Sequence, residues 1–155
     1  MYDDLTFAPE DDGAGSALDS RWNILIVDDD MDVHAMTTLT LKDVKIYGRP
    51  LNLMHSYSGQ EAIEHLMESM DVDLILLDMV METHDAGLRV ARWLREDTGM
   101  TETPIVILRT GHPGMLTADD VMKSKHFNAM MEKSNVTYHS LIATLTKMLP
   151  GPPTV

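Results

Sequence analysis

Hydrophobic and polar positions follow two periods along this chain, and together they predict five strands that alternate with five helices. Short runs of consecutive apolar residues, bounded by polar or turn-forming residues, are typical of strands that are buried on both faces. Segments in which apolar residues recur every three or four positions are typical of helices that bury one face. Strands are predicted at residues 22–27, 51–57, 73–78, 104–108 and 127–131, and helices begin near residues 32, 58, 85, 117 and 137.

Several predicted helices carry signals for their first turn or for their buried face. Ser58 and Glu61 form a capping box, in which the serine caps the helix and the glutamate reaches back. Asp85 and Thr117 are in position to cap the third and fourth helices. The first helix is expected to bury the face that carries Val33, Met36, Thr40 and Val44.

This alternation predicts one folded domain, in which a parallel sheet lies between two layers of helices. For five strands the common arrangement is the flavodoxin-like (βα)5 fold, a doubly wound α/β sheet with the strand order 2-1-3-4-5. Ligands of such folds bind at the carboxyl ends of the strands, near the switch point between the first and third strands. The side chains at those strand ends are therefore the candidates for function.

Acidic, hydroxyl and basic side chains stand at the predicted carboxyl ends. They are Asp28, Asp29 and Asp30 after the first strand, Asp78 at the end of the third, Thr110 after the fourth and Lys133 after the fifth. Two like charges about 4 Å apart repel by roughly 4 kcal/mol at an effective dielectric constant of about 20. An acidic cluster therefore needs a cation, and Mg²⁺ suits a site of oxygen ligands that is partly open to water. Together with a lysine and a threonine, it would suit phosphoryl transfer.

Composition and charge exclude two classes of partner. The 155 residues hold 25 acids against 12 Lys and Arg, for a formal net charge of −13, and contain no basic run. Nucleic-acid binding needs clustered cations, and a membrane span needs about 18 consecutive apolar residues. With neither feature, and with no cysteine for disulfides, the chain is expected to be a soluble cytoplasmic protein.

The acids are unevenly distributed, which divides the chain into three parts. Residues 1–20 contain six acids and no Lys or Arg, interleaved with Gly and Ser, and are expected to form a flexible acidic leader. Residues 21–149 form the expected folded domain. Residues 150–155 cannot continue a helix and are expected to form a tail.

Four segments at the strand ends resemble the receiver domain of bacterial two-component response regulators. They are ILIVDDD at 24–30, DLILLDMVM at 73–81, VILRTGHPG at 106–114 and MMEKS at 130–134. The resemblance extends over residues 22 to about 149 and implies that Asp78 is the phosphoacceptor, which takes a phosphoryl group from a histidine of a sensor kinase. The family chemistry is limited to self-catalysed phosphotransfer and autodephosphorylation, so the resemblance implies a signalling protein rather than an enzyme.

The same resemblance implies a role for each group around the acceptor. It implies a Mg²⁺ site made of Asp29 directly, Asp28 through water, Asp78 and the backbone carbonyl of Val80. It implies that Thr110 bonds the phosphoryl group and that Lys133 pairs with it. Met130 stands where the family usually has the aromatic residue that switches together with this threonine, and Arg109 is an extra residue directly before the threonine.

The resemblance also indicates how the signal would leave the domain. Phosphorylation is expected to change the face formed by the fourth helix, the fifth strand and the fifth helix. That face would bind an effector protein, a fused output domain or a second copy of the chain. The loops METHDAGLRVARWLRE and ILRTGHPG are similar to a narrower subgroup, in which the receiver often precedes a cyclic-dinucleotide phosphodiesterase. The chain is therefore either a stand-alone receiver or a receiver excised from a larger regulator.

Two other functions are compatible with these residues. A degenerate receiver would act as a phosphorylation-independent interaction module. A Mg²⁺-dependent aspartyl phosphatase would use the motif Asp28-x-Asp30 to form its covalent intermediate, but such enzymes need a further acidic pair after the lysine, and none follows Lys133. If the receiver interpretation holds, the apolar Val80 cannot orient a hydrolytic water, which predicts a long-lived phosphoryl group unless His112 positions that water.

Overall fold

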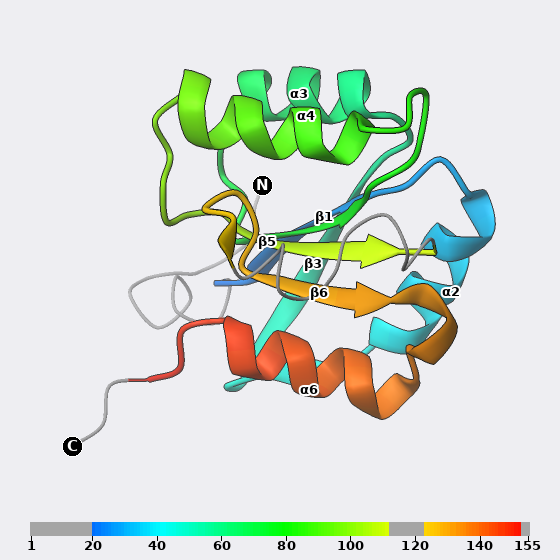
Figure 1. Ribbon diagram of the computed structural model, residues 1–155. Coiled ribbons are helices and arrows are strands. Elements are labelled where there is room, and N and C mark those ends of the chain that lie inside the picture. Colours follow the sequence, from blue (N-terminus) through cyan, green and yellow to red (C-terminus); the bar gives the residue numbers. More distant parts are fainter. Residues whose placement is uncertain (1–19, 112–122, 153–155) are drawn as a thin grey trace, which may run out of the picture.

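Five parallel strands form the central sheet of the computed structural model, which describes residues 20–111 and 123–152 (Figure 1). Across the sheet they stand in the order β3 (Arg49–Ser56), β1 (Trp22–Val27), β4 (Leu74–Asp78), β5 (Ile105–Thr110) and β6 (Ala129–Glu132). Numbered along the chain, this order is 2-1-3-4-5, so the predicted flavodoxin-like topology is confirmed. All four neighbouring pairs are parallel, and their carboxyl ends therefore meet at one edge of the sheet.

The sheet contains one further strand that the hydrophobic pattern did not predict. β2 (Lys45–Ile46) pairs antiparallel with the start of β3 at the edge of the sheet. Tyr47 and Gly48 connect the two strands with φ angles of 52° and 76°, as in a two-residue hairpin turn. The Tyr47 hydroxyl donates to the carbonyl oxygen of Thr146 at 2.8 Å, which ties this hairpin to the last helix. A strand of two residues is too short to produce a periodic signal.

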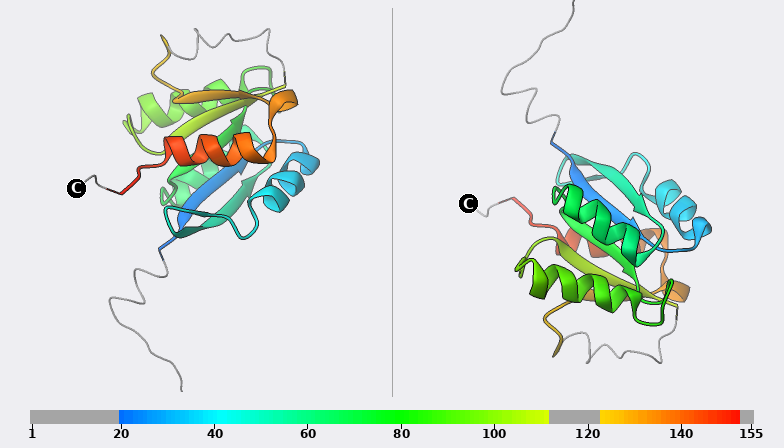
Figure 2. Two further views of the ribbon diagram at one scale, coloured as in Figure 1. Left: turned by 90° about the horizontal axis from the view of Figure 1, so that it is seen from below. Right: turned by 90° about the horizontal axis from the view of Figure 1, so that it is seen from above.

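Helices cover both faces of the sheet, as predicted (Figures 1 and 2). α2 (Met31–Leu41) and α6 (Tyr138–Met148) lie on one face, and α3 (Gly59–Glu68) and α4 (Ala86–Arg92) lie on the other. α4 continues into a π-helical turn, Trp93–Asp97. The helix predicted at residues 117–125 and the predicted acidic leader fall mostly outside the described residues. None of the helices in the described ranges is long and apolar enough to cross a membrane.

Side chains of each strand alternate between two apolar cores, one on each face of the sheet. In β5, Val106 and Leu108 belong to the core beneath α3 and α4, whereas Ile107 belongs to the core beneath α2 and α6. β4 is buried along its whole length, as its uninterrupted apolar run predicts. The alternation continues to the strand ends, where it decides the direction of the functional side chains.

The predicted buried face of α2 is only partly correct, because Val33, Thr40 and Val44 are half-buried. Met36, assigned to that face, is 64% exposed, and the helix buries His34, Thr37 and Leu41 instead. Polar residues occupy the inner face because each has a partner there. The ring of His34 bonds the carbonyl oxygen of Asp28 through Nε2 and the Nδ1 atom of a second histidine through its own Nδ1, each at 2.8 Å. Apolar periodicity alone cannot anticipate polar side chains that are buried and satisfied.

The predicted serine cap of α3 is present, whereas the predicted aspartate cap of α4 is not. Ser58 Oγ accepts a hydrogen bond from the Glu61 amide at 3.0 Å, but the Glu61 carboxylate accepts from the Tyr57 amide rather than from that of Ser58. Asp85 precedes α4 without capping it. Its carboxylate instead accepts hydrogen bonds from the hydroxyl of Thr83 at 3.0 Å and from Nε of a nearby arginine at 3.1 Å.

Candidate functional site

Three carboxylates meet at the carboxyl ends of β1 and β4. One oxygen each from Asp28, Asp29 and Asp78 lies within 4.8 Å of the others. Asp28 and Asp78 are buried, with exposed fractions of 1% and 5%, whereas Asp29 is exposed to solvent. The parallel pairing that places Val27 beside Leu77 brings the residues that follow them side by side. The topology therefore produces the predicted acidic cluster, and Asp29 marks its open side.

The three consecutive aspartates after β1 have two different roles. Asp30 caps α2, because its carboxylate accepts a hydrogen bond from the Asp32 amide at 2.9 Å. Asp28 turns inward, and its Oδ1 accepts from the Asp30 amide at 2.9 Å. Asp28 and Asp29 are thus available to the cluster, while Asp30 has the ordinary function of an acidic helix cap.

Lys133 joins the cluster from the end of β6. Its Nζ atom lies 2.8 Å from Oδ2 of Asp28 and 3.3 Å from Oδ2 of Asp78. Burial lowers the pKa of Lys133, but the hydrogen bond to Asp28 and the charge of Asp78 outweigh burial and raise the pKa above its ordinary value. The lysine is therefore a charged bridge between carboxylates from two strands.

The pKa of Asp78 is higher than that of an ordinary aspartate. Burial raises the pKa of Asp78 to about 6, and the neighbouring charge of Asp28 adds to this rise. Lys133 acts in the opposite direction, and Asp29 contributes a smaller increase. The pocket therefore holds more negative charge than its lysine neutralises. Carboxylates perturbed by burial and by like charges are concentrated at functional sites.

The donor set of this cluster fits Mg²⁺. Mg²⁺ prefers oxygen ligands and retains several of its waters, and the cluster offers three carboxylates with Asp29 on its open side. Burial is the largest cause of the raised pKa of Asp78, and the charges of Asp28 and Asp29 add to it, as expected for carboxylates that repel one another. Val80, whose backbone carbonyl is a predicted ligand, is half-buried two residues after Asp78.

Close contacts hold the loop that follows Asp78. The carboxylate of Glu82 accepts hydrogen bonds from the amides of Gly59 at 2.8 Å and Gln60 at 2.9 Å, at the start of α3. Burial raises the pKa of Glu82, but these amide hydrogen bonds outweigh burial and lower it below its ordinary value. At the other end of the loop, a Cβ atom on Gly87 would overlap the carbonyl oxygen of Asp78. α4 therefore approaches the end of β4 as closely as a glycine permits.

The two predicted switch residues lie on one face of the sheet. Thr110 is buried at the end of β5, and strand alternation places it on the same side as Leu108. Met130 is the partner of Leu108 in the β5–β6 register and packs against the core beneath α3 and α4. The structure therefore places these residues on one side, opposite α2 and α6.

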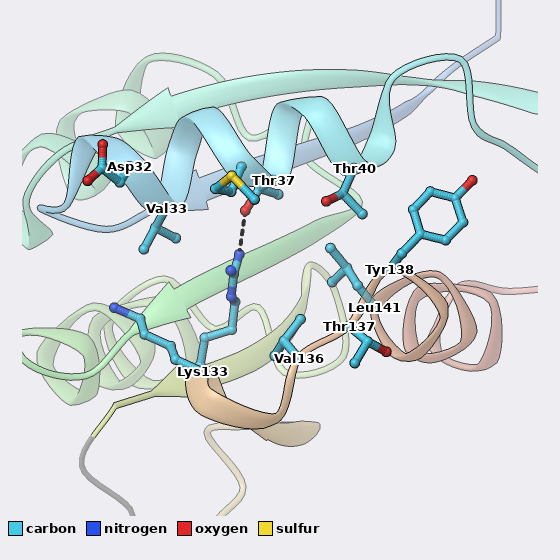
Figure 3. A pocket seen from close by; sticks show the side chains of 11 residues that line it. Asp32, Val33, Thr37, Thr40, Lys133, Val136, Thr137, Tyr138 and Leu141 are labelled. Atoms are coloured by element: carbon cyan, nitrogen blue, oxygen red, sulfur yellow. Dashed lines mark hydrogen bonds between the residues drawn. The ribbon is translucent and has the colours of Figure 1, made fainter.

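Arg109 is directed to the other face of the sheet. It stands in unbroken register with Asp78, so β5 accommodates the unusual arginine without a bulge. Its exposed fraction is 7%, and one guanidinium nitrogen donates to Oγ1 of Thr37 at 3.0 Å, the dashed line in Figure 3. The contacts of Arg109 and Glu82 were not predicted from the sequence. A basic residue at the end of an apolar strand indicates a buried charge with a specific role. The sheet face to which its side chain points, however, depends on the strand register.

These features define a receiver domain. The family model described as the response regulator receiver domain matches residues 24–137, and the chain belongs to this family. Among curated proteins, the chain is similar to the 3'3'-cGAMP-specific phosphodiesterase 2 of Vibrio cholerae, with 39% identity over 128 residues. The match covers 83% of this chain and 24% of that protein, so the chain spans about a quarter of its relative. This relative confirms the predicted resemblance to receivers of cyclic-dinucleotide phosphodiesterases.

Solved structures show the same fold. The signal receiver domain of a putative Luxo repressor protein from Vibrio parahaemolyticus matches with a TM-score of 0.66 and 22% identity, covering 83% of this chain and 90% of that one. The chemotaxis protein CheY4 of Vibrio cholerae matches with a TM-score of 0.66 and 19% identity, covering 84% and 100%. The receiver domain of an HD domain-containing protein from Pseudomonas fluorescens matches with a TM-score of 0.66 and 20% identity, covering 83% and 94%.

Proposed function

We propose that this chain is a phosphorylatable receiver of a two-component phosphorelay, in which Asp78 accepts a phosphoryl group from a histidine of a sensor kinase. The observation that carries this proposal is the position of Lys133, whose ammonium bridges Asp28 and Asp78 inside a cluster of three carboxylates. Asp28, Asp29, Asp78 and the carbonyl of Val80 would hold Mg²⁺. When bound there, Mg²⁺ would neutralise both the attacking carboxylate and the phosphoryl oxygens.

Phosphotransfer in this pocket forms one bond and breaks another. A carboxylate oxygen of Asp78 attacks the phosphorus, the P–N bond to the donor imidazole breaks, and the released imidazole takes up a proton. Lys133, already 3.3 Å from Asp78, pairs with a phosphoryl oxygen. The Thr110 hydroxyl donates a hydrogen bond to another. Both groups would therefore stabilise the negative charge of the phosphoryl group from their positions at the strand ends.

Phosphorylation then changes which protein the domain binds. Thr110 and Met130 share the sheet face through which we propose that the change spreads to the face made by residues 117–125, β6 and α6. The partner there is an effector protein, a fused output domain or a second copy of the chain. In this proposal the protein works in the cytoplasm, residues 21–149 are the receiver, and residues 1–20 and 150–155 are a flexible leader and a tail.

Labelling by a small phosphodonor tests the proposal. The purified chain is incubated with Mg²⁺ and acetyl phosphate or phosphoramidate, and intact-protein mass spectrometry measures the added phosphoryl group. We expect a label that disappears in Asp78→Asn and when Mg²⁺ is chelated. Asp30→Asn is the matched control, because asparagine also caps helices, and it should keep the label.

Two other outcomes would support the alternative functions. A label that disappears in Asp28→Asn but survives in Asp78→Asn would indicate the aspartyl phosphatase chemistry. No label from either donor, or from a co-purified sensor kinase, would indicate an interaction module that works without phosphorylation.

A further inference from the structure

We propose that Arg109 is a second, fixed cation of the phosphoacceptor site, which balances the charge of the magnesium-bound, phosphorylated pocket. This inference rests on the proposed function. It assigns to Arg109 an electrostatic role beside that of Lys133, exerted across the sheet rather than through direct contact with the phosphoryl group. Arg109 is therefore a positioning residue.

The strand register brings Arg109 beside the acceptor. Asp78 and Arg109 are partners in the parallel β4–β5 pair, and adjacent strands lie about 4.8 Å apart. Leu76 and Ile107, two positions earlier, both belong to the core beneath α2 and α6. Because side chains alternate along a strand, Asp78 and Arg109 project to this same face. Asp28 follows β1 on the other side of Asp78, so two carboxylates and a guanidinium form one row across the sheet.

Burial leaves the guanidinium charge with little other compensation. Arg109 is 7% exposed, and its Nε atom has no hydrogen-bond partner in the described part of the chain. Within residues 20–111 and 123–152, its guanidinium donates to the neutral hydroxyl of Thr37. Burial lowers the pKa of Arg109, while the charges of Asp28 and Asp78 raise it. These two carboxylates are therefore the anions that interact electrostatically with the guanidinium. An arginine nonetheless remains protonated in proteins.

Arg109 also lies beside open space. It borders a cavity of about 430 Å³ between α2 and α6, shared with Thr37 and Lys133 (Figure 3). Figure 3 shows Thr40 of α2 facing Tyr138 and Leu141 of α6 across this space. A residue selected to fill the core would close such a cavity with apolar atoms. The position holds a buried charge instead, on the side of the sheet where the acceptor projects.

The net charge of the pocket predicts that Arg109 has opposite effects on Mg²⁺ binding and on the phosphorylated state. Three carboxylates, Lys133 and Arg109 leave one net negative charge in the empty pocket. Mg²⁺ changes this to one positive charge, and phosphorylation of Asp78, which replaces one negative charge by about two, brings it near zero. Without Arg109 the phosphorylated pocket would keep one uncompensated negative charge. Arg109 therefore weakens Mg²⁺ binding before phosphorylation and stabilises the phosphorylated state afterwards.

Magnesium affinity of the unphosphorylated protein gives the decisive test. Isothermal titration calorimetry compares the wild type with Arg109→Gln, Arg109→Lys and Thr37→Val. Removal of the charge in Arg109→Gln should tighten Mg²⁺ binding by about tenfold. Arg109→Lys keeps the charge and Thr37→Val removes only the anchor, so both should stay near the wild-type affinity. At saturating Mg²⁺, the fraction labelled by acetyl phosphate should fall in Arg109→Gln and recover in Arg109→Lys.

The direction of the magnesium effect separates this role from a structural one. A residue that only supports the fold would leave Mg²⁺ affinity unchanged or weaken it when replaced, and either result with Arg109→Gln overturns the proposal. Circular dichroism establishes that each variant is folded, and Arg109→Met replaces Arg109→Gln if the buried amide prevents folding. If the wild type neither bound Mg²⁺ nor became labelled, the proposed function itself would be overturned. Failure of the Arg109 role can therefore be distinguished from failure of the proposed function.

Discussion

The ammonium of Lys133 lies closer to Asp28, at 2.8 Å, than to the proposed acceptor Asp78, at 3.3 Å. Before phosphorylation the lysine therefore neutralises mainly the carboxylate of the proposed metal site. The acceptor keeps part of its excess negative charge, in accord with its pKa of about 6. A phosphoryl group on Asp78 would compete with Asp28 for this ammonium. In the proposed reaction, the lysine would respond to the added phosphoryl group as well as support its transfer.

Replacing Lys133 by Gln should destabilise the protein in a pH-dependent way. The substitution leaves two buried carboxylates without their shared cation, which costs about 3 kcal/mol at neutral pH in Mg²⁺-free buffer. The loss should shrink as pH falls through about 6, because Asp78 then becomes protonated. Thermal unfolding at several pH values measures this, with Lys147→Gln on the exposed side of α6 as the control. Equal losses for the two variants would contradict the prediction.

Replacing Asp78 by Asn should stabilise the protein at neutral pH. The folded-state pKa of Asp78 is raised from 3.8 to about 6, so the folded protein binds the proton more tightly than the unfolded chain does. Stability therefore rises as pH falls through 6, and the ionised carboxylate costs about 3 kcal/mol above pH 7. We expect Asp78→Asn to raise the Tm by several degrees at neutral pH, with a smaller gain in acid.

Two comparisons make the Asp78 prediction specific. Asp71→Asn, at an exposed position outside the cluster, should leave the pH profile of the Tm unchanged. Adding Mg²⁺ should reduce the advantage of Asp78→Asn, because the cation relieves the repulsion in the wild type. A variant whose Tm is lower than that of the wild type at every pH would show that ionised Asp78 is not destabilising.

Glu82 should support both the fold and the metal site. Glu82→Ala removes the acceptor of two amide hydrogen bonds at the start of α3, an effect of about 1 kcal/mol for a helix cap. Because hydrogen bonding lowers the pKa of Glu82, its stabilising contribution is present at neutral pH and is lost on acidification. The freed loop should also bind Mg²⁺ more weakly, since it carries Val80. Glu68→Ala, exposed on the same helix, serves as the control for calorimetry and unfolding.

Gly87→Ala should be strongly destabilising. The added methyl group would overlap the backbone carbonyl of Asp78, which has no freedom to move within a buried strand. Forced overpacking of this kind costs about 1–3 kcal/mol. Gly59→Ala is a graded comparison, because its methyl group would meet the Val90 side chain at 3.3 Å and the Ala86 carbonyl oxygen at 3.4 Å, milder contacts than the one at position 87. Urea unfolding should therefore give a larger loss at position 87 than at position 59.

Val80 should lengthen the lifetime of the phosphoryl group. Its apolar side chain stands two residues after the acceptor and has no atom that orients a hydrolytic water. We expect Val80→Asn to accelerate loss of the label after the phosphodonor is removed, as followed by mass spectrometry. Val80→Ile retains the apolar character and should keep the slow rate. If hydrolysis is no faster with asparagine, Val80 does not control the lifetime.

Apolar periodicity predicted the order of the five parallel strands because buried strands and amphipathic helices leave long repeating patterns. β1 was predicted with its observed bounds, Trp22–Val27. The same reasoning missed β2, since two residues carry no period. It also placed the exposed Met36 on the buried face of α2 and missed His34, which is buried through hydrogen bonds to residues distant in sequence.

The candidate site was predictable where topology alone decides position. Asp28, Asp78 and Lys133 end strands whose carboxyl ends must meet, and the structure brings the three together. Contacts that depend on register or on loop conformation were beyond sequence reasoning. The direction of Arg109 follows from its pairing with Asp78, and the reach of Glu82 to α3 follows from the path of an irregular loop.

Arg109 and Thr110 are consecutive residues, yet the end of β5 directs one toward α2 and the other toward the opposite helix layer. The proposed reaction at Asp78 would therefore have two routes out of the sheet, an electrostatic one through a guanidinium and a hydrogen-bonding one through a hydroxyl. Substitutions at two adjacent positions should interrupt them separately. A domain built in this way can report one chemical event to partners on both of its sides.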